Sequence, residues 1–290
     1  MLANDRSLVG PDGGLIAYRV EGRGPAMVLT NGITTSNVFW TYLHRRWSSR
    51  YTVINWDLKG HGRSAPARSP GAASIPALAE DLLRVLDAAG SERATLVGFS
   101  MGCQVCLEAY RRAPERVNAL VLLLGGAGRV FDHALGPVGK LLHGSIARMS
   151  ARGFSISLRS LQRVVASPIA YRLGRGLRLL GHEARRADVQ RMVDHFVRDI
   201  DPATLSAMAL AAQEHSAEDL LPSITVPTLI VAGDRDVFAP GSHVAGLQTK
   251  IPGSELLRLP YGTHTSLVEH HAEIGAAVED FLRRRLSSVT

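Results

Sequence analysis

The stretch Ala94-Thr95-Leu96-Val97-Gly98-Phe99-Ser100-Met101-Gly102, followed by the run from Cys103 to Arg112, decides the fold. The apolar run before Gly98 predicts a strand, and the run after Gly102 predicts a helix. A serine between two glycines on a sharp strand-to-helix turn is a nucleophile elbow, because larger neighbours would crowd the turn. A serine hydroxyl is a poor nucleophile at neutral pH. The stretch therefore predicts a histidine, an acid and an oxyanion hole elsewhere in the chain.

The acid is expected between the serine and the histidine in chain order. The apolar run Thr228 to Ala232 predicts a strand that leads into Gly233-Asp234-Arg235-Asp236-Val237-Phe238-Ala239-Pro240. This loop offers two carboxylates, Asp234 and Asp236. Aspartates in turns often bond nearby backbone amides, so one of the two is expected to have only a structural role.

The histidine is predicted at His264. The run Glu255 to Leu259 predicts the last strand, and Tyr261-Gly262-Thr263-His264-Thr265 follows it. A histidine on this loop can take the serine proton and return it to the leaving group. The chain has eleven histidines, but we find the chain order and the strand-end loop together only at His264. We interpret most of the others, His61 and His133 included, as surface or packing residues.

An oxyanion hole needs two backbone N–H donors. Met101 follows the predicted nucleophile at the start of a helix, so its amide is the first candidate. The second donor is expected after the strand Ala26 to Thr30, in the loop Asn31-Gly32-Ile33-Thr34-Thr35.

Taken together, these motifs resemble the α/β-hydrolase superfamily. Members often have Gly-x-x-Asp-x-x-x-Pro after the acid strand, and this pattern favours Asp236 over Asp234. They commonly have His-Gly in the oxyanion loop, and the residue after this glycine donates its amide. The match to Gly32 implies Ile33 as the second donor, with Asn31 in place of the histidine. The backbone donor survives this change, whereas loop anchoring and substrate preference are expected to differ.

Composition is consistent with one large α/β domain, or a core with an insertion, because 46% of the 290 residues are hydrophobic. Alternating strands and helices predict a doubly wound, mostly parallel sheet. No apolar run approaches the ~20 residues of a membrane span. The first residues lack a basic region followed by an apolar segment, so we expect no secretory signal and a cytoplasmic protein. Cys103 and Cys106 are expected to pack inside a helix, and we expect no metal or cofactor.

The alternation stops between residues 128 and 221, where helical periodicity prevails. We predict a core of residues 1–127 and 222–290 and a helical insertion of residues 128–221. In the superfamily, an insertion at this point forms a helical cap over the active site. The alternative is a packing appendage away from the site.

The positive charge is concentrated in this insertion. The chain carries a net charge of +7, yet the segment from Arg129 to Arg186 alone has eleven Lys or Arg against Asp132 and Glu183. Many of the basic residues interleave with Leu, Val and Ile: Arg163, Arg172, Arg175, Arg178, Arg185 and Arg186. Such a stretch is either a solvated helix face or a weak contact site for an anionic membrane or an acidic substrate. A nucleic-acid partner is not expected, since no recognition module accompanies the arginines.

The resemblance implies a serine hydrolase of the carboxylesterase or lipase-like branch. Its substrate would be a small molecule, an ester, thioester or lactone, with a hydrophobic acyl group of medium or long chain length. Carbon–carbon bond hydrolases use the same residues, but they often have a tryptophan after the histidine, where this chain has Thr265. A biosynthetic acyltransferase or cyclase, and a non-catalytic ligand-binding protein on this fold, are further alternatives. The sequence leaves the acyl length, the acyl acceptor and the oligomeric state open.

Overall fold

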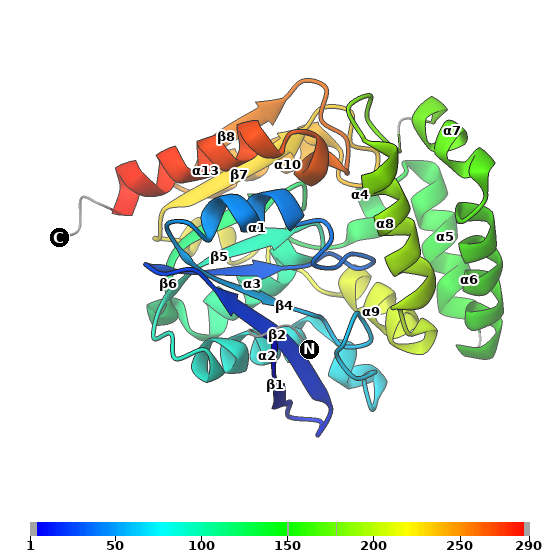
Figure 1. Ribbon diagram of the computed structural model, residues 1–290, viewed down its shortest axis with the longest axis horizontal. Coiled ribbons are helices and arrows are strands. Elements are labelled where there is room, and N and C mark those ends of the chain that lie inside the picture. Colours follow the sequence, from blue (N-terminus) through cyan, green and yellow to red (C-terminus); the bar gives the residue numbers. More distant parts are fainter. Residues whose placement is uncertain (1–4, 150, 178, 287–290) are drawn as a thin grey trace.

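The computed structural model describes residues 5–149, 151–177 and 179–286, so Arg178 of the basic stretch lies outside it. The described residues form an eight-stranded sheet in the order β1-β2-β4-β3-β5-β6-β7-β8 (Figure 1). The strands are β1 Asp5–Val9, β2 Leu15–Glu21, β3 Ala26–Thr30, β4 Thr52–Trp56, β5 Ala94–Phe99, β6 Val117–Leu123, β7 Thr228–Gly233 and β8 Glu255–Leu259. From β4 to β8 in this order, neighbouring strands pair in parallel. Strand β2 pairs antiparallel with both of its neighbours, β1 and β4. This confirms the predicted mostly parallel sheet.

The central strands are mostly apolar because helices cover both of their faces. Every residue of β5 and β7 is buried. The edge strand β1 is different, because each of its residues is half-buried or exposed. The residues of β1 contain no apolar run that predicts a strand, since an edge strand that pairs on one side needs none.

One face of the sheet is covered by helices from both halves of the core. On this face pack α2 Ile75–Ala88, α3 Gly102–Arg112, α10 Gly241–Ala245 and α11 Leu247–Lys250. The opposite face is covered by α1 Thr41–Trp47, α12 Ser266–Glu269 and α13 His271–Leu286. Short 3₁₀ helices occupy Pro70–Ala73, Pro114–Arg116 and Leu221–Ser223. Each face buries its own apolar cluster, so the sheet is held rigidly between two helical layers.

The helical insertion, residues 128–221, lies between β6 and β7. Its helices are α4 Val130–His133, α5 Pro137–Arg148, α6 Ala151–Val165, α7 Pro168–Gly176, α8 Arg186–Arg198 and α9 Pro202–Glu214. They gather at one side of the sheet, on the right in Figure 1. A backbone bridge between Gly128 and Ser216 joins its two ends, and a second bridge joins Ile200 to His61 of the core. The insertion also has a small apolar cluster of its own, which includes Phe154 and Leu158.

Candidate active site

Ser100 sits on the turn between β5 and α3, in a backbone conformation that side chains avoid. Its φ is +54°, in the left-handed region. A Cβ at position 98 would lie 2.5 Å from the Gly102 carbonyl oxygen, so glycine is required there. The Ser100 amide donates to the Leu123 carbonyl of β6 at 2.9 Å. Backbone strain held in place by surrounding structure is common at functional sites, and here it presents the hydroxyl beyond the strand end.

Ser100, His264 and Asp236 form one chain of hydrogen bonds. His264 Nε2 lies 3.0 Å from Ser100 Oγ, and His264 Nδ1 lies 2.7 Å from Asp236 Oδ2. The second carboxylate oxygen, Oδ1, accepts from the amides of Phe238 and Ala239 at 2.8 and 2.9 Å. The Asp236 side chain is fully buried. A carboxylate held by two amides is fixed in orientation, and it holds the imidazole with Nδ1 protonated and Nε2 facing the serine.

Asp234 has a different role from the one expected of it. Its carboxylate pairs with the Arg258 guanidinium at 2.7 Å near the surface, and makes this contact instead of the predicted bonds to nearby amides. The reason is that Arg258 comes from the neighbouring strand β8 and reaches the turn from the side. The structure therefore brings Asp236, and not Asp234, to His264.

The loop after β3 passes directly over Ser100. A Cβ at position 32 would lie 2.9 Å from the Ser100 Cβ, so only glycine permits this approach. Asn31 anchors the loop, because its Nδ2 donates to the Trp56 carbonyl at 2.9 Å and its Oδ1 accepts from Trp40 Nε1 at 2.8 Å. Both polar groups of this buried amide are satisfied. Asn31 thus anchors the loop in the position where superfamily members commonly have a histidine.

Two backbone amides near Ser100 remain available to a ligand. They belong to Ile33 on the loop after β3 and to Met101 just before α3. Both residues line the same cavity as Ser100. In the part of the chain that the structure describes, neither amide donates a hydrogen bond to another protein group. An unpaired buried amide is costly, so this pair is suited to bind an oxyanion.

His61, which the sequence predicts to be a surface or packing residue, packs against this loop and supports it. It is fully buried, with Nε2 2.6 Å from the Ile33 carbonyl oxygen and Nδ1 2.9 Å from that of Lys59. Burial lowers its pKa, because the charged imidazolium loses its hydration. The adjacent Gly60 and Gly62 in the sequence indicated a tight loop, but its contact with Ile33 spans 28 residues and has no local signal.

A large apolar cavity opens above Ser100 and His264. Its volume is about 490 Å³, which lies within the usual range for small-molecule sites. Core and insertion both contribute to its wall, with Phe39, Phe131, Phe154, Leu158, Leu205 and Phe238 among the lining residues. We call this space the apolar cavity. A narrower recess of about 30 Å³ adjoins Ser100 on another side, and is lined by the stacked rings of His133 and His243.

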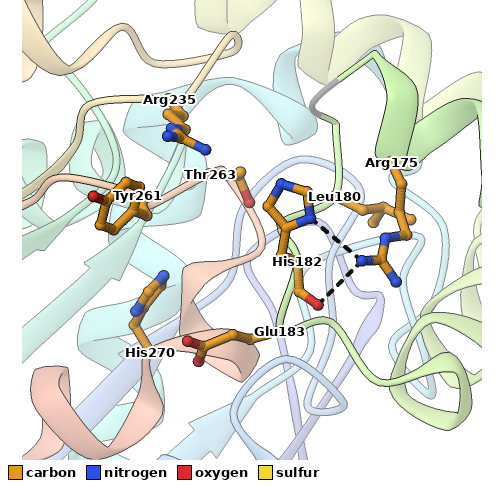
Figure 2. A pocket seen from close by; sticks show the side chains of 9 residues that line it. Arg175, Leu180, His182, Glu183, Arg235, Tyr261, Thr263 and His270 are labelled. Atoms are coloured by element: carbon orange, nitrogen blue, oxygen red, sulfur yellow. Dashed lines mark hydrogen bonds between the residues drawn. The ribbon is translucent and has the colours of Figure 1, made fainter.

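A separate polar cavity of about 130 Å³ lies at the junction of insertion and core (Figure 2). Its basic lining residues are Arg175, His182, Arg235 and His270. The Arg235 guanidinium stacks over the Tyr261 ring at 4.6 Å from its centre. Thr263 borders this polar cavity, whereas Thr265 borders the apolar cavity. The loop that carries His264 therefore lies between the two cavities.

The sheet order, the strained elbow and the placement of Ser100, Asp236 and His264 at strand ends define the α/β-hydrolase fold class. The comparisons with known proteins agree. A family model described as the alpha/beta hydrolase fold matches residues 25–271. The chain therefore belongs to the α/β-hydrolase family.

Relatives and solved structures match over nearly the whole chain. A protein from Variovorax paradoxus named "Putative carbamate hydrolase RutD" is 30% identical over an alignment of 277 positions that covers 92% of this chain and 96% of that protein. A hydrolase structure from Pseudomonas aeruginosa has a TM-score of 0.78 at 27% identity and covers 97% of this chain and 99% of its own. Est816, described as an N-acyl homoserine lactone degrading enzyme, has a TM-score of 0.73 at 25% identity and covers 95% and 100%. These similarities support hydrolase activity.

Proposed function

We propose that this protein is a serine hydrolase that cleaves carboxylic esters, thioesters or lactones with a hydrophobic acyl group. The observation that carries the proposal is the chain from Ser100 Oγ through His264 to buried Asp236, at the floor of the apolar cavity. The strained backbone of Ser100 and the two available amides are the further parts that acyl transfer requires. In this proposal the helical insertion acts as a cap, since it contributes much of the cavity wall.

In the first half of the reaction, Ser100 Oγ attacks the substrate carbonyl carbon while its proton passes to His264 Nε2. The carbonyl oxygen becomes an oxyanion, which accepts hydrogen bonds from the amides of Ile33 and Met101. Asp236 stabilises the imidazolium that forms. His264 then gives its proton to the leaving oxygen or sulfur, the bond to the leaving group breaks, and an ester between Ser100 and the acyl group remains.

In the second half, water takes the place of the leaving group. His264 removes a proton from water as it attacks the acyl carbon, and the same two amides bind the second oxyanion. Collapse of this intermediate releases the acid and returns the proton to Ser100. The same residues act in both halves of the reaction, because the water attacks from the side of the carbonyl carbon that the leaving group has left.

The apolar cavity supports a hydrophobic acyl group over a small polar one. Its polar lining residues are few, and they include Thr34, Ser145 and Ser157. A bound carbamate or other small polar substrate would leave most of the 490 Å³ unfilled. An alkyl chain would fill the space and bury apolar surface, which stabilises the complex by about 25 cal/mol per Å².

A panel of p-nitrophenyl esters tests this proposal. We expect kcat/KM to rise from the acetyl ester to a medium or long acyl ester, because each additional methylene buries apolar surface in the cavity. A short carbamate should be turned over more slowly than an ester of matched size. Turnover of none of these esters, or equal turnover by Ser100→Ala, would show the proposal to be wrong.

A further inference from the structure

The outer sides of α5, α6 and α7 expose an unusual number of large apolar side chains. In the rest of the described chain the exposed large apolar residues are few: the neighbouring pair Val9 and Leu15 on β1 and β2, and Tyr261. Here nine lie within forty residues: Val138, Leu141, Met149, Ile156, Leu161, Val164, Ile169, Leu173 and Leu177. Figure 1 shows the three helices together at the edge of the molecule, on the far side from the C-terminus. A gathering of this kind marks a surface that contacts something else.

The pattern is clearest on α7. Ile169, Leu173 and Leu177 follow one another at intervals of four residues, so they form a single stripe along the helix. They are 64%, 55% and 65% exposed. On α5, Val138 and Leu141 are 61% and 70% exposed and lie one turn apart. A solvent-facing stripe normally carries polar residues, so the stripe on α7 is not explained by packing within this chain.

Exposed arginine side chains lie on the same helices as these apolar residues. Arg148, Arg159, Arg163 and Arg172 are all exposed on the same three helices. Within residues 5–149, 151–177 and 179–286, none of the four pairs with a carboxylate. We define the basic apolar face as the nine apolar residues together with these four arginines.

The basic apolar face matches one occupant in both polarity and charge. We propose that it docks on a membrane surface that contains anionic lipids. Apolar side chains would enter the boundary between headgroups and acyl chains, while the arginines would lie among the phosphates. A second copy of this chain matches poorly, because the segment from 129 to 186 carries eleven bases and two acids and would face an equally positive surface.

The basic apolar face is continuous with the apolar cavity. Met149 and Leu161 are exposed by 37% and 51%, and both also line the cavity above Ser100. An acyl chain that leaves the lipid layer would therefore reach the cavity without crossing water. This step rests on the proposed function, and it indicates acyl esters that partition into membranes as the substrate class.

Vesicle co-sedimentation tests the docking without any turnover when the Ser100→Ala protein is used. With vesicles of phosphatidylcholine and phosphatidylglycerol at low salt, we expect most of the protein to sediment. With phosphatidylcholine alone, or in high salt, the bound fraction should fall several-fold, because exposed charges are screened. Absence of binding to the anionic vesicles at low salt would overturn the proposal.

Matched variants locate the contact. Replacing Ile169, Leu173 and Leu177 by Ser should weaken vesicle binding about tenfold or more, as should replacing Arg163 and Arg172 by Gln. Val9→Ser is the control, since Val9 is 61% exposed on β1. Circular dichroism and melting temperature should match for all variants. Unchanged vesicle binding by the triple Ser variant would refute the assignment to this face.

Two further readouts separate this inference from the proposed function. Hydrolysis of a soluble ester in the absence of vesicles uses only the catalytic residues and the apolar cavity, and the surface variants should leave it unchanged. A wild-type protein that hydrolyses the soluble ester but does not bind the vesicles would overturn the membrane inference and leave the proposed function intact. Sedimentation velocity covers the other occupant: a dimer that the triple Ser variant dissociates would show that the face binds a second copy instead.

Discussion

Asp236→Asn, compared with Asp234→Asn, is the substitution pair that tests the site most sharply. The two carboxylates are two residues apart on one loop, but they interact with different side chains. Asp236 Oδ2 lies 2.7 Å from His264 Nδ1 in a fully buried position. Asp234 pairs with Arg258, whose side chain is more than half exposed.

The structure determines the expected size of each effect. An amide at position 236 would offer no charge to the imidazolium and could leave His264 with the wrong nitrogen protonated. Comparable changes lower kcat by about 10⁴-fold, which corresponds to roughly 5 kcal/mol of transition-state stabilisation. Asp234→Asn removes a partly exposed ion pair worth about 0–1 kcal/mol of stability. We expect its kcat to stay within about twofold of the wild-type value.

Steady-state kinetics with the best p-nitrophenyl ester provides the assay, with the melting temperature as a check on folding. Asp236→Asn should lose kcat and kcat/KM together, since the contact acts mainly on the transition state. A large loss in Asp234→Asn with little change in Asp236→Asn would refute the assignment. Similar small losses in both variants would show that neither carboxylate supports the histidine.

Three further predictions follow from single contacts. His61→Ala removes the hydrogen-bond partner of the Ile33 carbonyl. We expect kcat to fall about tenfold with KM nearly unchanged, since a tenfold loss corresponds to about one net hydrogen bond. A tenfold rise in KM would contradict a role of His61 in holding the loop. Ala209→Leu fills part of the apolar cavity, so kcat/KM should fall about 10–200-fold for long acyl esters and little for acetyl esters, and a uniform loss would count against an acyl cavity. Burial raises the pKa of Asp57 to about 6 from 3.8. Between these two values the folded state keeps a proton that the unfolded state has lost. The contribution of Asp57 to stability is therefore full below pH 4 and declines as the pH rises through 6. Urea titrations measure the free energy of unfolding. Between pH 4 and pH 7, the stability of Asp57→Asn should rise by up to about 3 kcal/mol relative to that of the wild-type protein. A stability difference that does not change with pH would contradict this prediction.

The core could be predicted from sequence because its signals are local. The apolar runs that precede Ser100, Asp236 and His264 became β5, β7 and β8 almost residue for residue. Parallel strands end at one edge of a sheet, so chain order predicted that Ser100, His264 and an aspartate of the loop after β7 would approach one another. The choice of Asp236 over Asp234 came from the resemblance to the α/β-hydrolase superfamily.

Other features depend on contacts that the sequence does not mark. The pairing of Asp234 with Arg258 and the contact of His61 with the Ile33 carbonyl join residues that are 24 and 28 positions apart. The helical insertion was recognisable by periodicity, but which faces of its helices enclose the cavity depends on how they pack. The periodicity of α7 therefore does not show that its apolar stripe faces solvent, which depends on how the helix packs.

The central claim is that Ser100 is the nucleophile of an acyl-enzyme, and covalent labelling tests it most directly. Intact-mass spectrometry after treatment with a fluorophosphonate should show one adduct on the wild-type protein, located by peptide mapping at Ser100. The Ser100→Ala protein should remain unlabelled, and His264→Ala should label far more slowly because nothing removes the serine proton. Equal labelling of the wild-type and Ser100→Ala proteins would contradict the account.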